Sequence, residues 1–133
     1  MFRHHQPHDA DTLEERADRL MAEVFEPDDR MRLERLSADL APGFRFVTPT
    51  AVFDGPDGLS DAFAHFRHDA WRNAQLRRTS AVDGHHGYFH FTWERLDRGA
   101  VAESGLNVVQ LDDQGRIWRV ISFPGAGPEP APE

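Results

Sequence analysis

Residues 88–123 read YFHFTWERLDRGAVAESGLNVVQLDDQGRIWRVISF, and this stretch decides the fold class. At its start, Phe89, Phe91 and Trp93 alternate with more polar residues over residues 88–96. Successive side chains of a β-strand point to opposite faces of the sheet, so this alternation predicts a strand with one apolar face. The three aromatic side chains would then lie together on the inner side of a sheet.

Further strands are predicted on both sides of this one. Residues 101–111 and 116–123 read as two strands, and Asp112-Asp113-Gln114-Gly115 between them has the composition of a hairpin turn. Upstream, residues 76–83 form another candidate strand, which ends at a turn over Asp83-Gly84. Strands joined by such short turns pair antiparallel, so we predict an antiparallel sheet in the second half of the chain.

The first part of the chain is predicted to form two helices. Asp11 or Thr12 can cap the first helix, which Pro27 ends. The second helix follows at once and ends at Pro42-Gly43, because these residues break a helix. Its apolar positions are Met31, Leu33, Leu36 and Leu40.

A strand and a third helix complete the expected elements. Phe44–Thr48 reads as a strand that Pro49 ends, and residues 54–58 read as a turn. Pro56 suits the first turn of a helix, and this helix is expected to end near Trp71. The order of elements therefore favours an α+β domain in which helices cover one face of a curved sheet.

The composition argues against several classes of partner and chemistry. The formal net charge of −8 disfavours nucleic acid and an anionic membrane surface, because both bind clustered cations. The absence of Cys excludes disulfides, thiolate catalysis and Cys-based zinc sites. No apolar run is long enough to cross a bilayer and no signal peptide is recognisable, so we expect a cytoplasmic protein.

Several short motifs, in order along the chain, carry a resemblance to a known superfamily. They are Phe44–Pro49, Gly55-Pro56-Asp57-Gly58-Leu59, His86–Trp93, and Leu111-Asp112-Asp113-Gln114-Gly115-Arg116-Ile117 followed by Phe123. Their order and spacing resemble the NTF2-like superfamily, and within it the SnoaL-like group. The resemblance implies an α+β cone, in which a curved antiparallel sheet wraps around helices and encloses an internal pocket.

The resemblance also sets the expected organisation of the chain. It spans about residues 12–125, and we expect a single domain over residues 11–124 with flexible tails at residues 1–10 and 125–133. It implies a homodimer that forms through the outer face of the sheet. That face is expected to carry exposed Ile and Val side chains, which need covering. Its predicted residues are His90, Thr92, Val108, Gln110, Ile117, Arg119 and Ile121.

Two positions depart from the best-known members of the superfamily. Ketosteroid isomerases carry a carboxylate base where this sequence has Thr48, and a protonated carboxyl donor where it has Asn107. The polyketide cyclases use an acidic residue near the position of Asn107. Neither a threonine hydroxyl nor an asparagine amide can exchange protons as a carboxylate does near neutral pH. We therefore argue against steroid-type isomerisation.

The wall of the expected pocket is mostly apolar and aromatic. Such a lining suits a flat hydrophobic molecule held by a few hydrogen bonds, but the same residues could also fill a closed core. By strand alternation and by the resemblance, the predicted ligand-binding residues are Phe46, Thr48, Phe63, Phe66, Trp71, Phe89, Phe91, Trp93, Asn107, Val109 and Ser122.

Two histidines are the candidate catalytic residues. His65 and His68 lie three residues apart on the third predicted helix, where either could act as an acid or base at the pocket mouth. A catalytic zinc normally needs three protein ligands, and no third ligand can be named. We therefore predict neither a metal nor a cofactor.

Two functions remain open. The first is a cofactor-independent cyclase, isomerase or dehydratase that acts on a small hydrophobic or aromatic molecule in the pocket. The second is a non-catalytic ligand-binding or dimerisation module, which the missing carboxylates at positions 48 and 107 favour.

Overall fold

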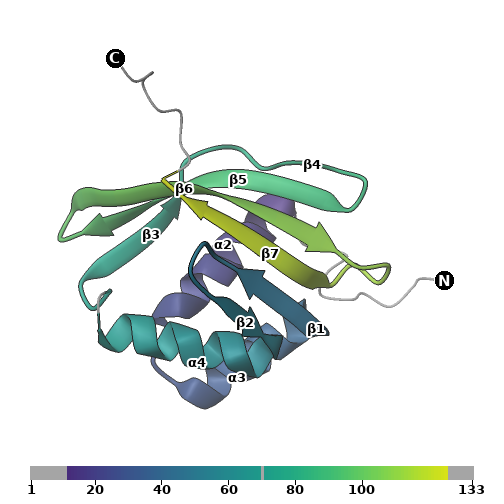
Figure 1. Cartoon of the computed structure of the whole chain (residues 1–133), viewed down its shortest axis with the longest axis horizontal. Helices are drawn as coiled ribbons and strands as arrows, with labels where there is room; N and C mark the ends of the chain where they lie inside the picture. The colour runs from purple at the N-terminus through teal and green to yellow at the C-terminus, as the bar shows by residue number, and fades with distance from the viewer. Residues whose placement is uncertain (1–11, 70, 126–133) are drawn as a thin grey trace.

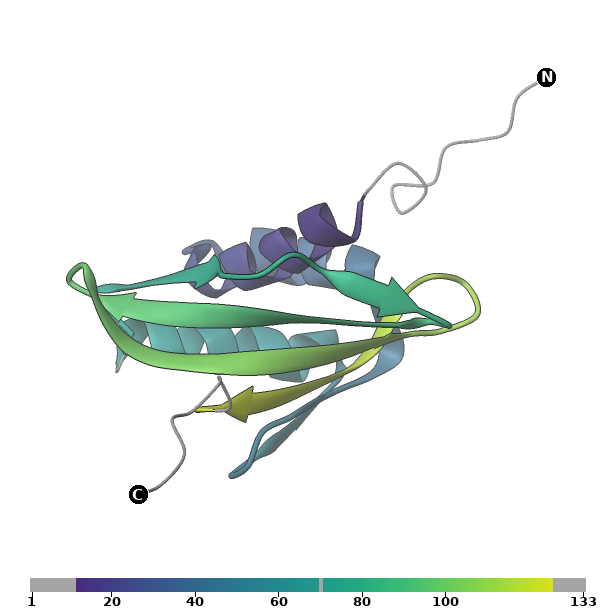
Figure 2. The same ribbon diagram turned by 90° about the horizontal axis from the view of Figure 1, so that it is seen from above.

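The computed structural model describes residues 12–69 and 71–125 of the chain. Within these residues, three α-helices lie on one side of a curved, seven-stranded sheet (Figures 1 and 2). The helices are α2 (Leu13–Ala22), α3 (Asp29–Asp39) and α4 (Gly55–His68), with a 3-10 turn η1 (Glu23–Phe25) after α2. The strands are β1 (Leu40–Val47), β2 (Val52–Asp54), β3 (Ala74–Arg78), β4 (Asp83–His85), β5 (Tyr88–Asp97), β6 (Ala100–Leu111) and β7 (Ile117–Pro124). This is the predicted α+β cone.

The sheet has the strand order β2-β1-β7-β6-β5-β3, and β4 pairs with the first residues of β5. Every pair is antiparallel except β1 and β7, which run parallel with Phe46 opposite Val120. The antiparallel prediction applies to strands that are neighbours in the chain and are joined by short turns. β1 and β7 are far apart in the chain, so no turn constrains their direction.

Helix caps follow local chemistry. Thr12 caps α2: its hydroxyl accepts from the Glu15 N–H at 3.0 Å, and the Glu15 carboxylate accepts from the Thr12 N–H at 2.9 Å. The alternative cap, Asp11, lies outside the described residues. Asp28 caps α3 by accepting from the Met31 N–H at 3.0 Å.

The predicted end of the second helix and the predicted start of the next strand, at Phe44, are both wrong. The second helix does not run to Pro42-Gly43, because Leu40 already pairs with Ile117 in β1 and is 2% exposed. The β1–β7 register shifts between Leu40 and Arg45, and this irregularity accommodates Pro42, which has no N–H to donate to a ladder.

Other predicted positions also differ. Met31 and Leu33 are 45% and 38% exposed, so they are not buried positions of α3. The predicted strand over residues 76–83 is two strands, and Asp83-Gly84 belongs to β4 instead of a turn. Asp83 pairs with His90 across this edge of the sheet.

A buried arginine ties α3 to α4. Arg32 is 1% exposed, and its Nε donates to the Ser60 hydroxyl at 2.9 Å. The same guanidinium pairs with the Asp29 carboxylate and donates to the Glu26 carbonyl, so each of its three nitrogens makes a hydrogen bond. This link fixes α4 against α3, and α4 in turn presents its apolar face to the sheet.

The predicted single domain covers the described residues with one exception, and the rest of both predicted tails lies outside them. The exception is Gly125, whose N–H donates to the Ser104 carbonyl. Among the described helices, none combines the length and apolarity needed to cross a membrane.

Candidate functional site

Cross-strand register sorts the concave face of the sheet into rows. In the row next to the β6–β7 hairpin, Phe89, Val109 and Val120 are direct neighbours on β5, β6 and β7. Each of the three is at most 1% exposed. This end of the cone is therefore packed shut by apolar side chains.

The next row changes character across the sheet. Phe91 pairs with Asn107, and Asn107 pairs with Ser122. Phe91 is fully buried, whereas Asn107 is only partly buried and Ser122 is 7% exposed. Here the packed core gives way to polar groups on two neighbouring strands.

The last two rows continue towards the open end. Trp93 lies opposite Gly105, which in turn pairs with Pro124, and Arg95 lies opposite Glu103. Side chains directly opposite one another share a face of the sheet, so this end of the concave face carries an indole ring and a charged pair.

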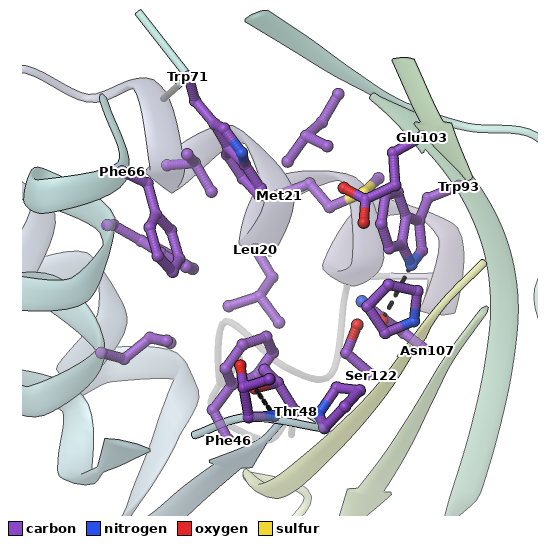
Figure 3. A pocket seen from close by; sticks show the side chains of 17 residues that line it. Leu20, Met21, Phe46, Thr48, Phe66, Trp71, Trp93, Glu103, Asn107 and Ser122 are labelled. Carbon is purple, nitrogen blue, oxygen red and sulfur yellow. Dashed lines mark hydrogen bonds between the residues drawn. The ribbon is translucent and has the colours of Figure 1, made fainter. Parts of the chain in front are cut away.

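A cavity of about 440 Å³ opens between these rows and the helices. Helices α2 and α4 supply the wall opposite the sheet (Figure 3). Its size is in the range of small-molecule sites, and its lining is predominantly apolar. The lining residues are Leu20, Met21, Val24, Phe46, Thr48, Pro49, Thr50, Leu59, Phe63, Phe66, Trp71, Leu76, Trp93, Glu103, Asn107, Ser122 and Pro124.

One hydrogen bond orients the polar centre of the cavity. The indole Nε1–H of Trp93 donates to Oδ1 of Asn107 at 3.0 Å (Figure 3). An indole N–H can only donate, so the oxygen of the Asn107 amide must face it. The amide nitrogen of Asn107, which can only donate, is therefore left for another partner.

Gly105 makes this arrangement possible. A Cβ atom at Gly105 would lie 2.4 Å from Cζ2 and 2.7 Å from Cε2 of Trp93. The indole ring therefore lies directly over the backbone of β6, and from there its N–H reaches Asn107. Any larger residue at position 105 would push the ring away.

Ser122 on β7 pairs with Asn107 on β6, and both side chains point into the cavity (Figure 3). Within the described part of the chain, neither the Ser122 hydroxyl nor the Asn107 Nδ2 makes a hydrogen bond. Two donors thus face the cavity from paired positions.

Thr48 also lines the cavity, but its hydroxyl is engaged in a turn. Oγ1 of Thr48 donates to the Ala51 carbonyl at 3.1 Å and accepts from the Ala51 N–H at 3.0 Å. It accepts a longer bond from the Thr50 N–H at 3.3 Å as well. Thr48 therefore mainly shapes the wall.

Aromatic rings and a charged pair border the cavity at its other end. Phe66 and Trp71 pack with ring centroids 4.9 Å apart, and the Arg95 guanidinium lies 5.5 Å from the Trp71 centroid. Nε of Arg95 donates to Oε1 of Glu103 at 3.2 Å. Glu103 lines the cavity and Arg95 does not.

Most of the residues predicted for the pocket wall do line this cavity. Phe89, Phe91 and Val109 do not, because they lie deeper, in the closed apolar core. The remaining eight predicted residues are cavity residues: Phe46, Thr48, Phe63, Phe66, Trp71, Trp93, Asn107 and Ser122.

The carboxylate of the cavity, Glu103, is not among the residues predicted from the sequence. Glu103 is two and four residues before Gly105 and Asn107 on β6, so strand alternation places all three on one face. That signal was present in the sequence. The contributions of α2, from Leu20 and Met21, and of η1, from Val24, carried no comparable signal, because they depend on how this segment docks.

The two predicted catalytic histidines lie away from the cavity. α4 turns Phe63 and Phe66 inward, and it leaves His65 and His68 exposed to solvent. Nε2 of His65 is 3.9 Å from an Asp69 carboxylate oxygen, and both side chains are about three-quarters exposed. Among the described residues, no group of three His, Cys, Asp or Glu side chains could hold a metal ion.

The outer sheet face differs from prediction at one residue. Ile117 is 1% exposed and belongs to the core, because the β6–β7 register shifts between Gln110 and Leu111 and turns Ile117 inward. Val108 and Ile121 remain partly exposed on the outer face and pair across β6 and β7. The homodimer through this face stays a prediction.

Comparisons with known proteins found similar proteins among solved structures. No family model matches the sequence, and no curated protein matches it. A protein from Agrobacterium tumefaciens, named as a candidate isomerase of the SnoaL-like family, has 25% sequence identity and a TM-score of 0.76. That match covers 81% of this chain and 92% of the other.

Two further structures share the fold. A protein from Jannaschia sp., named as a candidate SnoaL-like polyketide cyclase, is 14% identical with a TM-score of 0.62, over 84% of this chain and 90% of the other. A de novo designed NTF2-fold protein is 16% identical with a TM-score of 0.64, over 84% of this chain and 82% of the other.

Proposed function

We propose that this chain, an NTF2-like protein of the SnoaL-like group, binds a small, largely apolar carbonyl compound in the cavity. The observation that carries the proposal is the Trp93 Nε1–H bond to Asn107 Oδ1 at 3.0 Å. It leaves the Asn107 amide nitrogen as a donor beside the Ser122 hydroxyl. A ligand carbonyl oxygen has two lone pairs and can accept from both.

The rest of the cavity suits the body of such a ligand. Phe63, Phe66 and Trp71 offer ring surfaces on one side, and the Trp93 indole offers another. Aromatic surfaces of this kind favour a flat apolar body, since stacked and edge-to-face rings add to the energy of area burial. Two structurally similar proteins bear names of small-molecule enzymes, which is consistent with a small-molecule ligand.

A matched pair of probes tests the proposal. Benzylacetone has an aromatic ring and a ketone, and butylbenzene has nearly the same shape without the carbonyl. We expect the wild-type protein to bind benzylacetone about tenfold more tightly, because each net hydrogen bond contributes about 0.5–1.5 kcal/mol. Isothermal titration calorimetry measures both affinities.

Substitution of the anchor makes the test specific. Asn107→Leu should remove most of the preference for benzylacetone while keeping the affinity for butylbenzene. Asn73→Leu, the same change at an exposed position outside the cavity, should keep the preference. Equal binding of both probes to the wild type would contradict the carbonyl anchor, and no binding of either would contradict the pocket.

A second candidate is a cofactor-independent isomerase, cyclase or dehydratase. The observation that favours it is Glu103, a carboxylate on the cavity wall and thus a group able to accept a proton. His65 and His68 are too exposed to serve this role. For this candidate the reacting carbon lies at Glu103 instead of at Asn107. Protein-dependent deuterium incorporation next to the benzylacetone carbonyl in D₂O, lost in Glu103→Gln, would support catalysis; incorporation at the buffer rate would contradict it.

A further inference from the structure

The cavity has two polar ends separated by an indole ring. Asn107 and Ser122 form one end, Glu103 forms the other, and Trp93 lies over Gly105 between them (Figure 3). Glu103 and Asn107 are four residues apart on β6, so their Cα atoms are on the order of 13 Å apart at about 3.3 Å per residue. Both side chains stand out from the same face of the strand, so a molecule of one or two rings can span the gap between them.

The charged pair is arranged so that the acid faces the cavity. Arg95 donates to one oxygen of Glu103, while its guanidinium lies against the Trp71 ring. The Glu103 side chain is 34% exposed, twice the 17% of Arg95. Within the described residues, the second oxygen of Glu103 accepts no hydrogen bond. Arg95 therefore supports the carboxylate from behind and leaves Oε2 for a ligand.

We propose that Glu103 determines ligand specificity by accepting a hydrogen bond from a hydroxyl or ammonium group at the end of the ligand distant from its carbonyl. This inference rests on the proposed function and names the ligand class more narrowly. The ligand is an aromatic carbonyl compound with a distal hydrogen-bond donor. Its carbonyl lies at Asn107 and Ser122, its ring lies along Trp93, and its donor reaches Glu103.

The chemistry of the acceptor explains the selectivity. An ionised carboxylate has acceptor sites only, so it can pair with a donor and cannot pair with another acceptor. A ligand carboxylate at the same place would face Glu103 with like charge in a cavity with apolar walls, and this repulsion discriminates against it. A methoxy group has the same oxygen atom as a hydroxyl group but carries a methyl group in place of the hydrogen, so it has no proton to donate.

Four probes with one scaffold test the inference. They are benzylacetone and its para-hydroxy, para-methoxy and para-carboxy derivatives, titrated calorimetrically into the wild-type protein. A hydrogen bond to a charged acceptor is among the stronger ones, so the hydroxy probe should bind about tenfold more tightly than the methoxy probe. The carboxy probe should bind most weakly of the four.

The variant Glu103→Gln shows whether position 103 causes this order. A glutamine can both donate and accept, so the hydroxy–methoxy difference should fall to about twofold or less and the carboxy probe should gain affinity. Glu34→Gln removes the same charge from an exposed site on α3, and it should leave the wild-type order unchanged.

The outcomes separate the inference from the proposed function. If benzylacetone binds but the hydroxy and methoxy probes bind equally well, the inference is overturned and the carbonyl anchor stands. If none of the four probes binds, the proposed function fails and the inference fails with it. The wild-type series needs no variant, so it decides the matter even if Glu103→Gln folds poorly. An unchanged probe order in a folded Glu103→Gln protein would also overturn the inference.

Discussion

The two ends of the concave face are built from the same strands and differ in what each inner side chain faces. At the closed end, Phe89 lies opposite Val109, and both are almost fully buried. At the open end, Trp93 lies opposite Gly105, and its ring covers the β6 backbone at a place from which a larger partner would displace the ring. The same alternation therefore produces a packed core at one end and a cavity at the other.

The boundary between the two ends is the row of Phe91, Asn107 and Ser122. Asn107 and Ser122 are short polar residues where the row before has two valines. Asn107 and Ser122 line the cavity, whereas Val109 and Val120 belong to the closed core. A single cross-strand row thus decides where the core stops and where a ligand can begin.

The largest effect on stability is expected at the closed end. Phe91→Ala removes a fully buried ring and should lower the free energy of unfolding by about 3–5 kcal/mol. Urea unfolding followed by circular dichroism measures this. Phe66→Ala, which removes a ring from the cavity wall, is the matched change and should cost less, because Phe66 is only partly buried. Equal losses at the two sites would erase the distinction between core and cavity.

A smaller effect on stability, with a specific effect on binding, is expected at the open end. Gly105→Ala introduces a Cβ that would lie 2.4 Å from the Trp93 ring, so the indole must move. We expect a loss of about 1–3 kcal/mol in stability together with loss of the preference for benzylacetone over butylbenzene.

Gly43→Ala is the control for Gly105→Ala. A Cβ at Gly43 meets nothing within 4 Å, so this change should affect neither stability nor binding strongly. A Gly105→Ala protein that keeps wild-type stability and full carbonyl preference would show that the position of the Trp93 ring does not orient Asn107.

The smallest effect is expected at the hairpin beyond the closed end. Oδ1 of Asp112 accepts from the backbone N–H groups of Gln114 and Arg116 at 2.9 Å, and Oδ2 accepts from the Arg116 Nε at 3.2 Å. Burial alone would raise the pKa of Asp112, but these bonds and the Arg116 charge outweigh it and hold the pKa below the ordinary value of 3.8.

The sign of the pH dependence follows from this lowered pKa. A carboxylate with a lower pKa in the folded state stabilises the protein above its unfolded pKa, and the contribution is lost as the pH falls through the folded pKa. Asp112→Asn should therefore lower stability by about 1 kcal/mol or less at pH 7, and this gap should shrink below about pH 4. Urea midpoints measured across this pH range test it, and a pH-independent gap would contradict it.

The sequence predicted the concave face well because side-chain alternation is a property of the strand backbone. Alternation together with the family resemblance places Trp93, Asn107 and Ser122 on the pocket wall, and all three line the cavity. Counting could not tell that Phe89 and Phe91 lie below the cavity floor. That distinction depends on the size of the cross-strand partner and on how α2 docks, and neither is encoded in the period of one strand.

Irregular strand pairing limited what the sequence pattern could predict at other positions. A register shift in the β6–β7 pair turned Ile117 into the core, and another in the β1–β7 pair allowed β1 to start at Leu40. A shift of one residue moves a side chain to the opposite face, so local pattern cannot anticipate it. Glu103 is a different case, because its position follows from the same alternation as Asn107 and yet it is not among the predicted residues.

The most direct test of the account uses the three tryptophan indole N–H signals in a ¹H–¹⁵N NMR spectrum during a titration with benzylacetone. Trp71 and Trp93 line the cavity, whereas Trp118 does not line it and has the Arg119 guanidinium 4.3 Å from its ring centroid. Each signal can be assigned with a Trp→Phe variant. The account predicts that the Trp93 signal shifts most, the Trp71 signal shifts as well, and the Trp118 signal stays in place. A titration in which the Trp93 signal stays fixed, or in which Trp118 alone responds, would contradict it.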